Sequence, residues 1–188
     1  MGLIKGFLKG RRITVAVTAI ITLAAVYGVY RTERHISSYK FCTSCHSMTF
    51  PDAETKKSSH FGRLGIYPEC KDCHLPPRFL QRIFTHLTEG VHDTIGNFKY
   101  DLNTKEKFDK HRAAFAHIAR AAMKKTDSVN CRKCHKAPNP ASDYGKMQHK
   151  KIGSSGTTCI DCHQNLVHEY VPEEDIAKGI EEGRIVLR

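Results

Sequence analysis

One five-residue motif, Cys-x-x-Cys-His, occurs four times in this chain of 188 residues and accounts for all eight of its cysteines. The cysteines are Cys42, Cys45, Cys70, Cys73, Cys131, Cys134, Cys159 and Cys162, and the motif histidines are His46, His74, His135 and His163. This spacing is typical of c-type haem attachment, in which both thiols bond to the porphyrin and the next histidine reaches the iron. Zinc tetrathiolates and disulfides also use paired cysteines, but neither explains a histidine after every second cysteine. The motifs therefore predict a tetrahaem cytochrome with four covalently attached haems.

The composition indicates that the chain alone can build only a thin apolar core. It contains no tryptophan, and the part that carries the motifs, about residues 39–170, has few long apolar runs. Four porphyrins would supply the missing apolar bulk. We therefore expect a mainly α multihaem cytochrome c, packed around haems and built from short helices and irregular chain.

The net charge of +11 raises the question of nucleic-acid binding, because a basic domain can attract phosphates. Each haem, however, brings two propionates, and four haems lower the net charge to about +3. We therefore predict no nucleic-acid partner.

An apolar stretch near the N-terminus predicts a membrane anchor. Residues 13–30 carry no charge, and as a helix they would extend roughly 27 Å, enough to cross a hydrocarbon core. A cleaved signal peptide usually has a shorter apolar region that ends in a small-x-small site. This stretch is longer and ends in Tyr-Gly-Val-Tyr-Arg, which favours an uncleaved single-pass anchor.

Basic residues precede the apolar stretch and no acidic residue does. They are Lys5, Lys9, Arg11 and Arg12. The positive-inside rule then predicts a cytoplasmic N-terminus, at residues 1–12, and places the rest of the chain across the membrane. Bacterial c-type haems are attached outside the cytoplasm, so we expect an inner-membrane protein whose haem domain, residues 31–171, lies in the periplasm.

The motifs fall into two halves of matched length. Cys42 and Cys70 are 28 positions apart, as are Cys131 and Cys159, and a histidine precedes the second motif of each half by ten positions. These histidines are His60 and His149. The repeat predicts two pseudo-repeated di-haem halves, at about 39–77 and 128–169. They are joined by a helical connection at 78–127 and followed by a tail at 172–188.

The connection and the tail have helical patterns. After Pro76-Pro77, apolar residues recur every three or four positions at Leu80, Phe84, Leu87, Val91, Ile95 and Phe98, and the other side carries His86, Glu89, Asp93 and Asn97. A second helix is predicted from Asn103 to about Lys125, with Phe108, Phe115, Ile118 and Ala122 inward. The acidic start of the tail predicts a short surface helix that ends near Gly183.

Each haem iron needs a second axial ligand besides its motif histidine. If the halves are related by a pseudo-twofold axis, His60 and His149 play matching roles, and we expect each to reach across to the other half. His168 follows His163 by five positions, whereas the matching position in the first half is Phe79. The first half therefore lacks one ligand, and we expect the first haem to be the deficient one.

The sequence resembles the NapC/NirT family of membrane-anchored tetrahaem quinol dehydrogenases, which includes the small subunit of the cytochrome c nitrite reductase complex. The resemblance covers nearly the whole chain. Besides the anchor it lies in Cys42-Thr-Ser-Cys-His-Ser-Met48, Ser-Ser-His60, Cys70-x-Asp-Cys-His-x-Pro76, Met147-Gln-His149, Cys159-Ile-Asp-Cys-His163 and Asn165-Leu-Val-His168. Together these motifs are specific to the family.

The resemblance implies roles for individual residues. Met48 matches a methionine that can ligate the first haem in place of His46, and Asp93 matches an acidic residue beside the open face of that haem. The implied ligand pairs are His60 with His163, His168 with His135, and His149 with His74. One position departs from the family pattern, because His86 stands where the family often has a lysine that lines the quinol pocket.

We interpret the protein as a quinol dehydrogenase that takes electrons from menaquinol or ubiquinol and passes them to a periplasmic reductase, such as a nitrite or nitrate reductase. Asp93 and His86 are seven positions apart, nearly two helical turns, and as neighbours on one face they could accept the protons of the quinol. An anchored electron shuttle without a quinone site, and a catalytic multihaem reductase, are the alternatives. Self-association into a homo-oligomer is left open.

Overall fold

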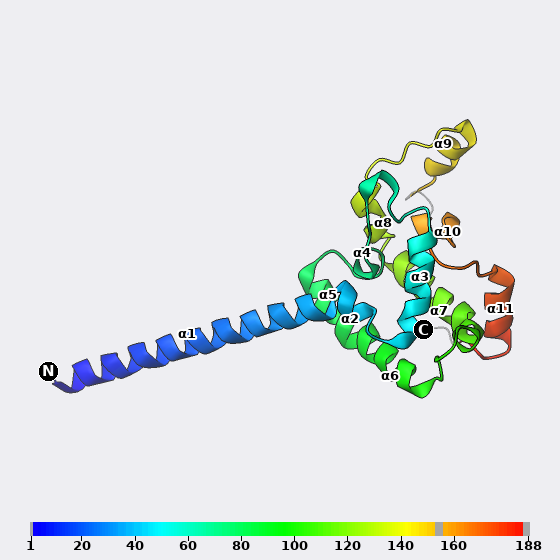
Figure 1. The fold of residues 1–188 in the computed structure, drawn as a ribbon. Helices are drawn as coiled ribbons and strands as arrows, with labels where there is room; N and C mark the ends of the chain where they lie inside the picture. Colours follow the sequence, from blue (N-terminus) through cyan, green and yellow to red (C-terminus); the bar gives the residue numbers. More distant parts are fainter. Residues whose placement is uncertain (1, 153–155, 186–188) are drawn as a thin grey trace. The chain divides into compact units, whose positions relative to one another are not determined.

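A computed structural model describes residues 2–152 and 156–185, and the chain divides into two compact units, Met1–Ser38 and Tyr39–Arg188. The first unit is formed by one continuous helix, α1 (Gly2–Ile36), drawn in blue in Figure 1. Within Gly10–Ile36, the most apolar window of 18 residues has a mean hydropathy of 2.0 and is not buried. Its length and composition fit a single membrane anchor, as predicted, although the helix continues beyond residues 13–30 at both ends.

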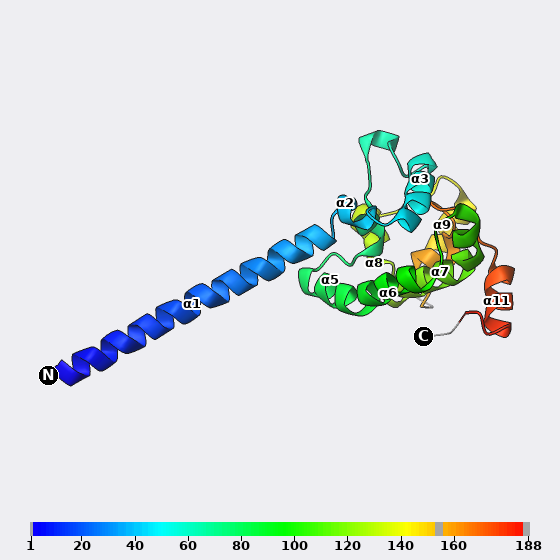
Figure 2. The ribbon, with the colours of Figure 1, turned by 60° about the horizontal axis from the view of Figure 1, so that its bottom comes forward.

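The second unit consists of short helices and irregular chain. Its elements are α2 (Tyr39–Cys42), η1 (His46–Met48), α3 (Thr49–Lys57), η2 (Arg63–Gly65), α4 (Cys70–His74), α5 (Phe79–Thr85), η3 (His86–Gly90), α6 (Val91–Lys99), α7 (Lys105–Lys125), α8 (Val129–Cys134), α9 (Asp143–His149), α10 (Cys159–Cys162) and α11 (Glu173–Glu181). The described residues include no strand. Figures 1 and 2 show the short helices from two directions. The prediction of a mainly α fold is therefore confirmed.

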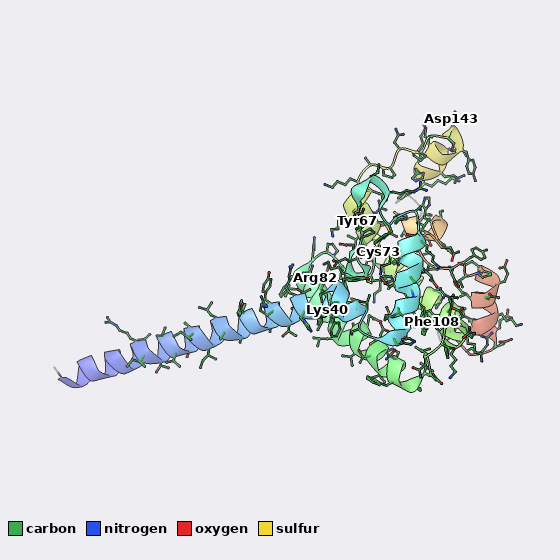
Figure 3. The ribbon with its side chains drawn as sticks, viewed as in Figure 1. Lys40, Tyr67, Cys73, Arg82, Phe108 and Asp143 are labelled. Atoms are coloured by element: carbon green, nitrogen blue, oxygen red, sulfur yellow. The ribbon has the colours of Figure 1, made fainter. Side chains whose placement is uncertain are left out.

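Helix α7 is the longest element of this unit. It begins after Thr104, whose hydroxyl accepts a hydrogen bond from the backbone N–H of Lys107 at 3.3 Å, and this cap replaces the expected start at Asn103. The helix ends at Lys125, as predicted. Phe108, labelled in Figure 3, is buried in α7 and packs on Phe50 of α3 at a ring distance of 5.6 Å.

The tail packs more closely than expected. Helix α11 begins after Pro172 with three acidic residues and ends before Gly183, as the sequence predicts. It is more than a surface helix, because Val171, Ile176 and Ile185 are buried together against the alanines of α7. Gly179 permits this contact, since a Cβ atom there would lie 2.6 Å from Ile185.

The apolar core of the protein is thin. In the described part of the chain, the buried hydrophobic residues are Leu102, Phe108, Val171, Ile176 and Ile185. All of them lie on or beside α7 and in the tail, and none of them belongs to a motif. Most residues around the motifs are half-buried or exposed. This confirms that the polypeptide supplies little core of its own.

Candidate haem sites

Three of the four motifs lie on a helical turn. The second, third and fourth motifs occupy α4, α8 and α10, where two cysteines three positions apart share a face. In α4, the Asp72 carboxylate accepts a hydrogen bond from the Glu69 N–H at 2.9 Å, and in α10 the Asp161 carboxylate accepts one from the Thr158 N–H at 2.7 Å. These aspartates cap the turns that present the thiols, a role the sequence analysis missed but that a capping-box pattern could have indicated.

The first motif has a different conformation. Helix α2 ends at Cys42, and the 3-10 turn η1 begins at His46 and ends at Met48. The His46 Nε2 atom lies 3.0 Å from the carbonyl oxygen of Asn103, and its ring meets that of Phe50 edge-on at 5.5 Å. Met48 is 37% exposed. The first site therefore differs from the other three in its backbone and its neighbours.

Side-chain hydrogen bonds hold the second and third motifs together. The side-chain amide of Asn130 in α8 donates to the carbonyl oxygens of Cys73 and Leu75, at 2.7 and 2.9 Å. Lys133 of α8 also pairs with Asp72 of α4 at 3.2 Å. Cys73 is labelled in Figure 3. These contacts fix two motifs that lie 61 positions apart in the sequence.

Two further contacts extend this arrangement to all four motifs. Helix α2 contacts α4, and Cys42 lies beside Cys70 there, which joins the first motif to the second. The hydroxyl of Ser128 accepts a hydrogen bond from the backbone N–H of Ile160 at 3.2 Å, which joins the third motif to the fourth. The four attachment sites therefore follow one another in space in the order of the sequence.

Three pairs of imidazole rings lie close together in this unit. The pairs are His60 with His135 at 6.4 Å, His74 with His168 at 6.1 Å, and His149 with His163 at 5.9 Å between ring centroids. Two imidazoles on opposite sides of one iron have centroids about 6 Å apart, because a metal–nitrogen bond is about 2 Å and the ring centre lies about 1 Å further. The residues present therefore fit bis-histidine ligation of three haems.

The pairs differ from those that the resemblance implied. His60 was expected beside His163, His168 beside His135, and His149 beside His74. In this structure His60 lies beside a histidine of the other half, whereas His149 lies beside a histidine of its own half. The axial ligands of the irons, including matching roles for these two histidines, stay a prediction.

Local structure explains why the two halves differ. After His60, the Gly62 N–H donates to the Ile66 carbonyl at 2.8 Å, and Phe61 packs on Tyr67 at 5.2 Å. This closed loop separates His60 from the motif that follows it. In the second half the matching histidine, His149, is the last residue of a helix, α9. Equal spacing in the sequence therefore gives different positions in space.

A buried carboxylate lies behind one of the paired histidines. Glu54 of α3 accepts two hydrogen bonds from Arg112 of α7, at 2.7 and 3.0 Å, and one from the Glu169 N–H at 3.1 Å. Its Oε2 atom lies 3.5 Å from Nδ1 of His168, an electrostatic contact longer than a typical hydrogen bond. Carboxylates in this position orient ligand histidines. No short-range pattern joins these residues, which explains why sequence reasoning missed the cluster.

The surroundings set the protonation of this cluster. Burial would raise the pKa of Glu54, but the hydrogen bonds from Arg112 and from the Glu169 N–H, together with the nearby charges, outweigh it and hold the pKa below its ordinary value. The surrounding protein atoms desolvate the His74 imidazole and lower its pKa to about 4, although part of the residue is exposed, and the neighbouring His168 lowers the pKa as well. Burial also lowers the pKa of His168. Both imidazoles are therefore neutral at pH 7, the form that binds a metal.

We predict that Glu54→Gln lowers the free energy of unfolding by about 3 kcal/mol, because it leaves the Arg112 guanidinium buried without its full counter-charge. Denaturant unfolding at pH 7, followed by circular dichroism, measures the change. The control is Lys56→Gln on the same helix, which removes an exposed ion pair with Asp52 and should cost less than about 1 kcal/mol. Equal losses in the two variants would contradict a structural role for Glu54.

Asp93 and His86 do not share one helical face as expected. The segment η3 (His86–Gly90) is a π turn, which winds by fewer degrees per residue than an α-helix. The side chains of two residues seven positions apart across this turn therefore point in directions about a quarter turn apart. In agreement, His86 is half-buried whereas the Asp93 side chain is 75% exposed. Asn97 faces the first motif, because it accepts a hydrogen bond from Ser47 of η1 at 2.6 Å.

The fold and the four attachment sites define a helical multihaem c-type cytochrome. Residues 8–173 match the family described as NapC/NirT cytochrome c family, N-terminal region. The chain therefore belongs to the NapC/NirT cytochrome c family and is an electron-transfer cytochrome with four c-type haems. This confirms the resemblance and the cofactors predicted from the sequence.

Individual relatives agree with this family. A Nitrosomonas europaea protein named "Probable tetraheme cytochrome c-type" is 45% identical over 95% of this chain and 77% of its own length. The cytochrome c-type protein NapC of Haemophilus influenzae is 29% identical over 90% of this chain and 89% of its own. The denitrification system component NirT of Stutzerimonas stutzeri is 30% identical over 86% of this chain and 85% of its own length. No solved structure matches the chain.

Proposed function

We propose that this protein is a quinol dehydrogenase, which oxidises a membrane quinol and passes the electrons to a periplasmic reductase. The observation that carries the proposal is the set of three histidine pairs. It includes the motif histidines of the second, third and fourth sites, whereas His46 contacts Asn103 and Phe50. The first site therefore differs from an ordinary electron-transfer site, and it is the one closest in sequence to the anchor.

The ligand assignment follows from the pairs. We assign His74 and His168 to the second haem, His135 and His60 to the third, His163 and His149 to the fourth, and either His46 or Met48 to the first. When bound, each haem supplies a one-electron carrier, so the two electrons of a quinol can be taken up singly. The chain contributes the row of four attachment sites and the neutral imidazoles.

Quinol oxidation also releases two protons, which need acceptors beside the ring. We assign the first acceptor to Asp93, an exposed carboxylate on α6 that can pass its proton to water. His86 lies on the half-buried side of the same segment. We therefore propose that its imidazole contacts the quinol from a different side than the Asp93 carboxylate does. The His86 imidazole lies along Gly90, with Nδ1 3.6 Å from the place where a Cβ atom would be, and Asp93 follows one turn later.

The proposal is tested by mixing the oxidised protein anaerobically with a soluble menaquinol analogue and following haem absorbance. We expect the quinol to reduce the haems and a quinone-site inhibitor to slow the reduction. Dithionite, which needs no quinol site, provides the control. An anchored shuttle without such a site would be reduced by dithionite and not by the quinol, and that result would overturn the proposal.

We predict that His60→Ala and His149→Ala each convert one of the four haems from low spin to high spin, because each removes one axial ligand. Electron paramagnetic resonance of the oxidised protein counts the two spin states. The control is His111→Ala, since this histidine packs on Tyr100 at 4.8 Å and belongs to none of the three pairs. Loss of two low-spin haems in one variant, or of none, would contradict the assignment.

A further inference from the structure

A row of large apolar side chains is exposed on one segment of the second unit. The row comprises Leu80 on α5, Phe84 on α5, Leu87 on η3, and Val91, Ile95 and Phe98 on α6, and these side chains are 50–84% exposed. In a soluble domain such a stripe ordinarily faces the core. A contiguous exposed apolar patch of this kind instead marks an interaction surface.

The opposite side of the segment packs on the domain. Ile83, His86 and Asn97 are half-buried, and the Asn97 side chain accepts a hydrogen bond from Ser47 of η1 at 2.6 Å. Ile95, two positions before Asn97, lies about 160° away from it around the helix. The apolar row is therefore turned away from η1, and a haem held beside η1 does not cover it.

We propose that the apolar row of α5, η3 and α6 inserts into the headgroup region of an anionic phospholipid bilayer, the one in which α1 is anchored. Tyr39, the first residue of the second unit, follows the uncharged stretch that ends at Tyr30 by nine positions: six residues of α1, which extend about 9 Å, and three more, which reach about 10 Å at most. Ser47, eight positions after Tyr39, donates a hydrogen bond to Asn97 of α6. Chain continuity thus keeps a bilayer surface within reach of the segment.

The charges around the row agree with this occupant. Arg78, immediately before α5, and Lys99, the last residue of α6, are exposed, and Arg82 within α5 hydrogen-bonds the Pro77 carbonyl at 2.9 Å. The acidic residues of the segment, Glu89 and Asp93, lie in its middle and not at its ends. A helical segment with exposed leucine and phenylalanine side chains and basic residues at its borders is typical of peptides that lie in the plane of a membrane interface. This contact is independent of quinol oxidation.

Photolabelling of the full haem-loaded chain tests the proposal. The chain is placed in vesicles of phosphatidylcholine and phosphatidylglycerol that contain a phospholipid with a diazirine in its acyl chain, irradiated, and digested with trypsin. Cleavage after Arg82 and Lys99 isolates residues 83–99, which hold η3 and α6. We expect at least about tenfold more lipid adducts on this peptide than on residues 113–120 of α7, which pack within the domain.

Two matched variants sharpen the test. Leu87→Glu places a charge in the row at a position that is already 67% exposed, so the fold should tolerate it, and adducts on peptide 83–99 should fall about tenfold. Gln81→Glu places the same charge at an exposed polar position of α5 and should leave the adducts unchanged. The haem content of each variant confirms that it has folded.

Two results would overturn the proposal. Adducts on peptide 83–99 as few as on the α7 peptide would show that lipid does not cover the row. Adducts that appear only when the protein is strongly diluted in lipid would show that a second copy of the chain covers it. Because labelling needs no electron transfer, it can succeed while quinol oxidation fails, and the reverse.

Discussion

Without its haems, the second unit should not fold. A domain of about 150 residues ordinarily buries roughly two thirds of its surface. In the described part of this unit, however, the buried hydrophobic residues are confined to α7 and the tail, and the four motifs have no apolar core around them. The haems must therefore supply most of the buried apolar surface. Chain produced in a host without haem-attachment enzymes should show no cooperative unfolding transition and should be cut rapidly by proteases.

A variant that lacks one haem provides the control for this result. Cys159→Ser together with Cys162→Ser removes the fourth attachment site, at the far end of the row from the first motif. The remaining three haems should keep the second unit folded, with a lower midpoint of denaturation. A cooperative transition in the chain without any haem would contradict the role given to the porphyrins.

Asp93→Asn should slow quinol oxidation by about 10²-fold or more, because it removes a proton acceptor and keeps the size of the side chain. The side chain is 75% exposed, so its replacement should leave the stability of the fold unchanged. The rate of haem reduction by a soluble menaquinol analogue measures the effect, and reduction by dithionite should be unaffected. His86→Leu should also slow turnover, but by a smaller factor.

Glu89→Gln is the matched control for Asp93→Asn. Glu89 is another exposed carboxylate, one helical turn earlier on η3, and its replacement should change the rate by less than about twofold. Unchanged rates in both the Asp93 and His86 variants would place the quinol site elsewhere. Equal slowing by the Asp93 and Glu89 variants would indicate a general charge effect and not a specific acceptor.

The sequence predicted the features that depend on short-range patterns. The spacing of cysteines and histidines predicted the haems, and the uncharged run of residues 13–30 predicted the apolar helix α1. Helical periodicity and capping residues located α7 to within two positions at its start. These signals were sufficient because each is set by residues close together in the chain.

Features that depend on distant contacts were predicted poorly. The ring of His60 lies beside His135 because a closed loop, residues 61–67, follows it, and sequence spacing contains no information on such a loop. The prediction that His86 and Asp93 share one face assumed an ordinary α-helix. The π turn of η3 instead rotates one of these side chains away from the other. The Glu54–Arg112 pair spans 58 positions, so no local pattern could have indicated it.

Three of the four haems should have two histidine ligands each, and the first haem should not. Near-infrared magnetic circular dichroism of the fully oxidised protein measures this ligation, because the technique distinguishes bis-imidazole iron from iron with other ligands. With four haems established by a pyridine haemochrome assay, we predict a bis-imidazole signal that corresponds to three haems and a separate signal for the remaining one. A signal from four bis-imidazole haems, or from two, would contradict the account.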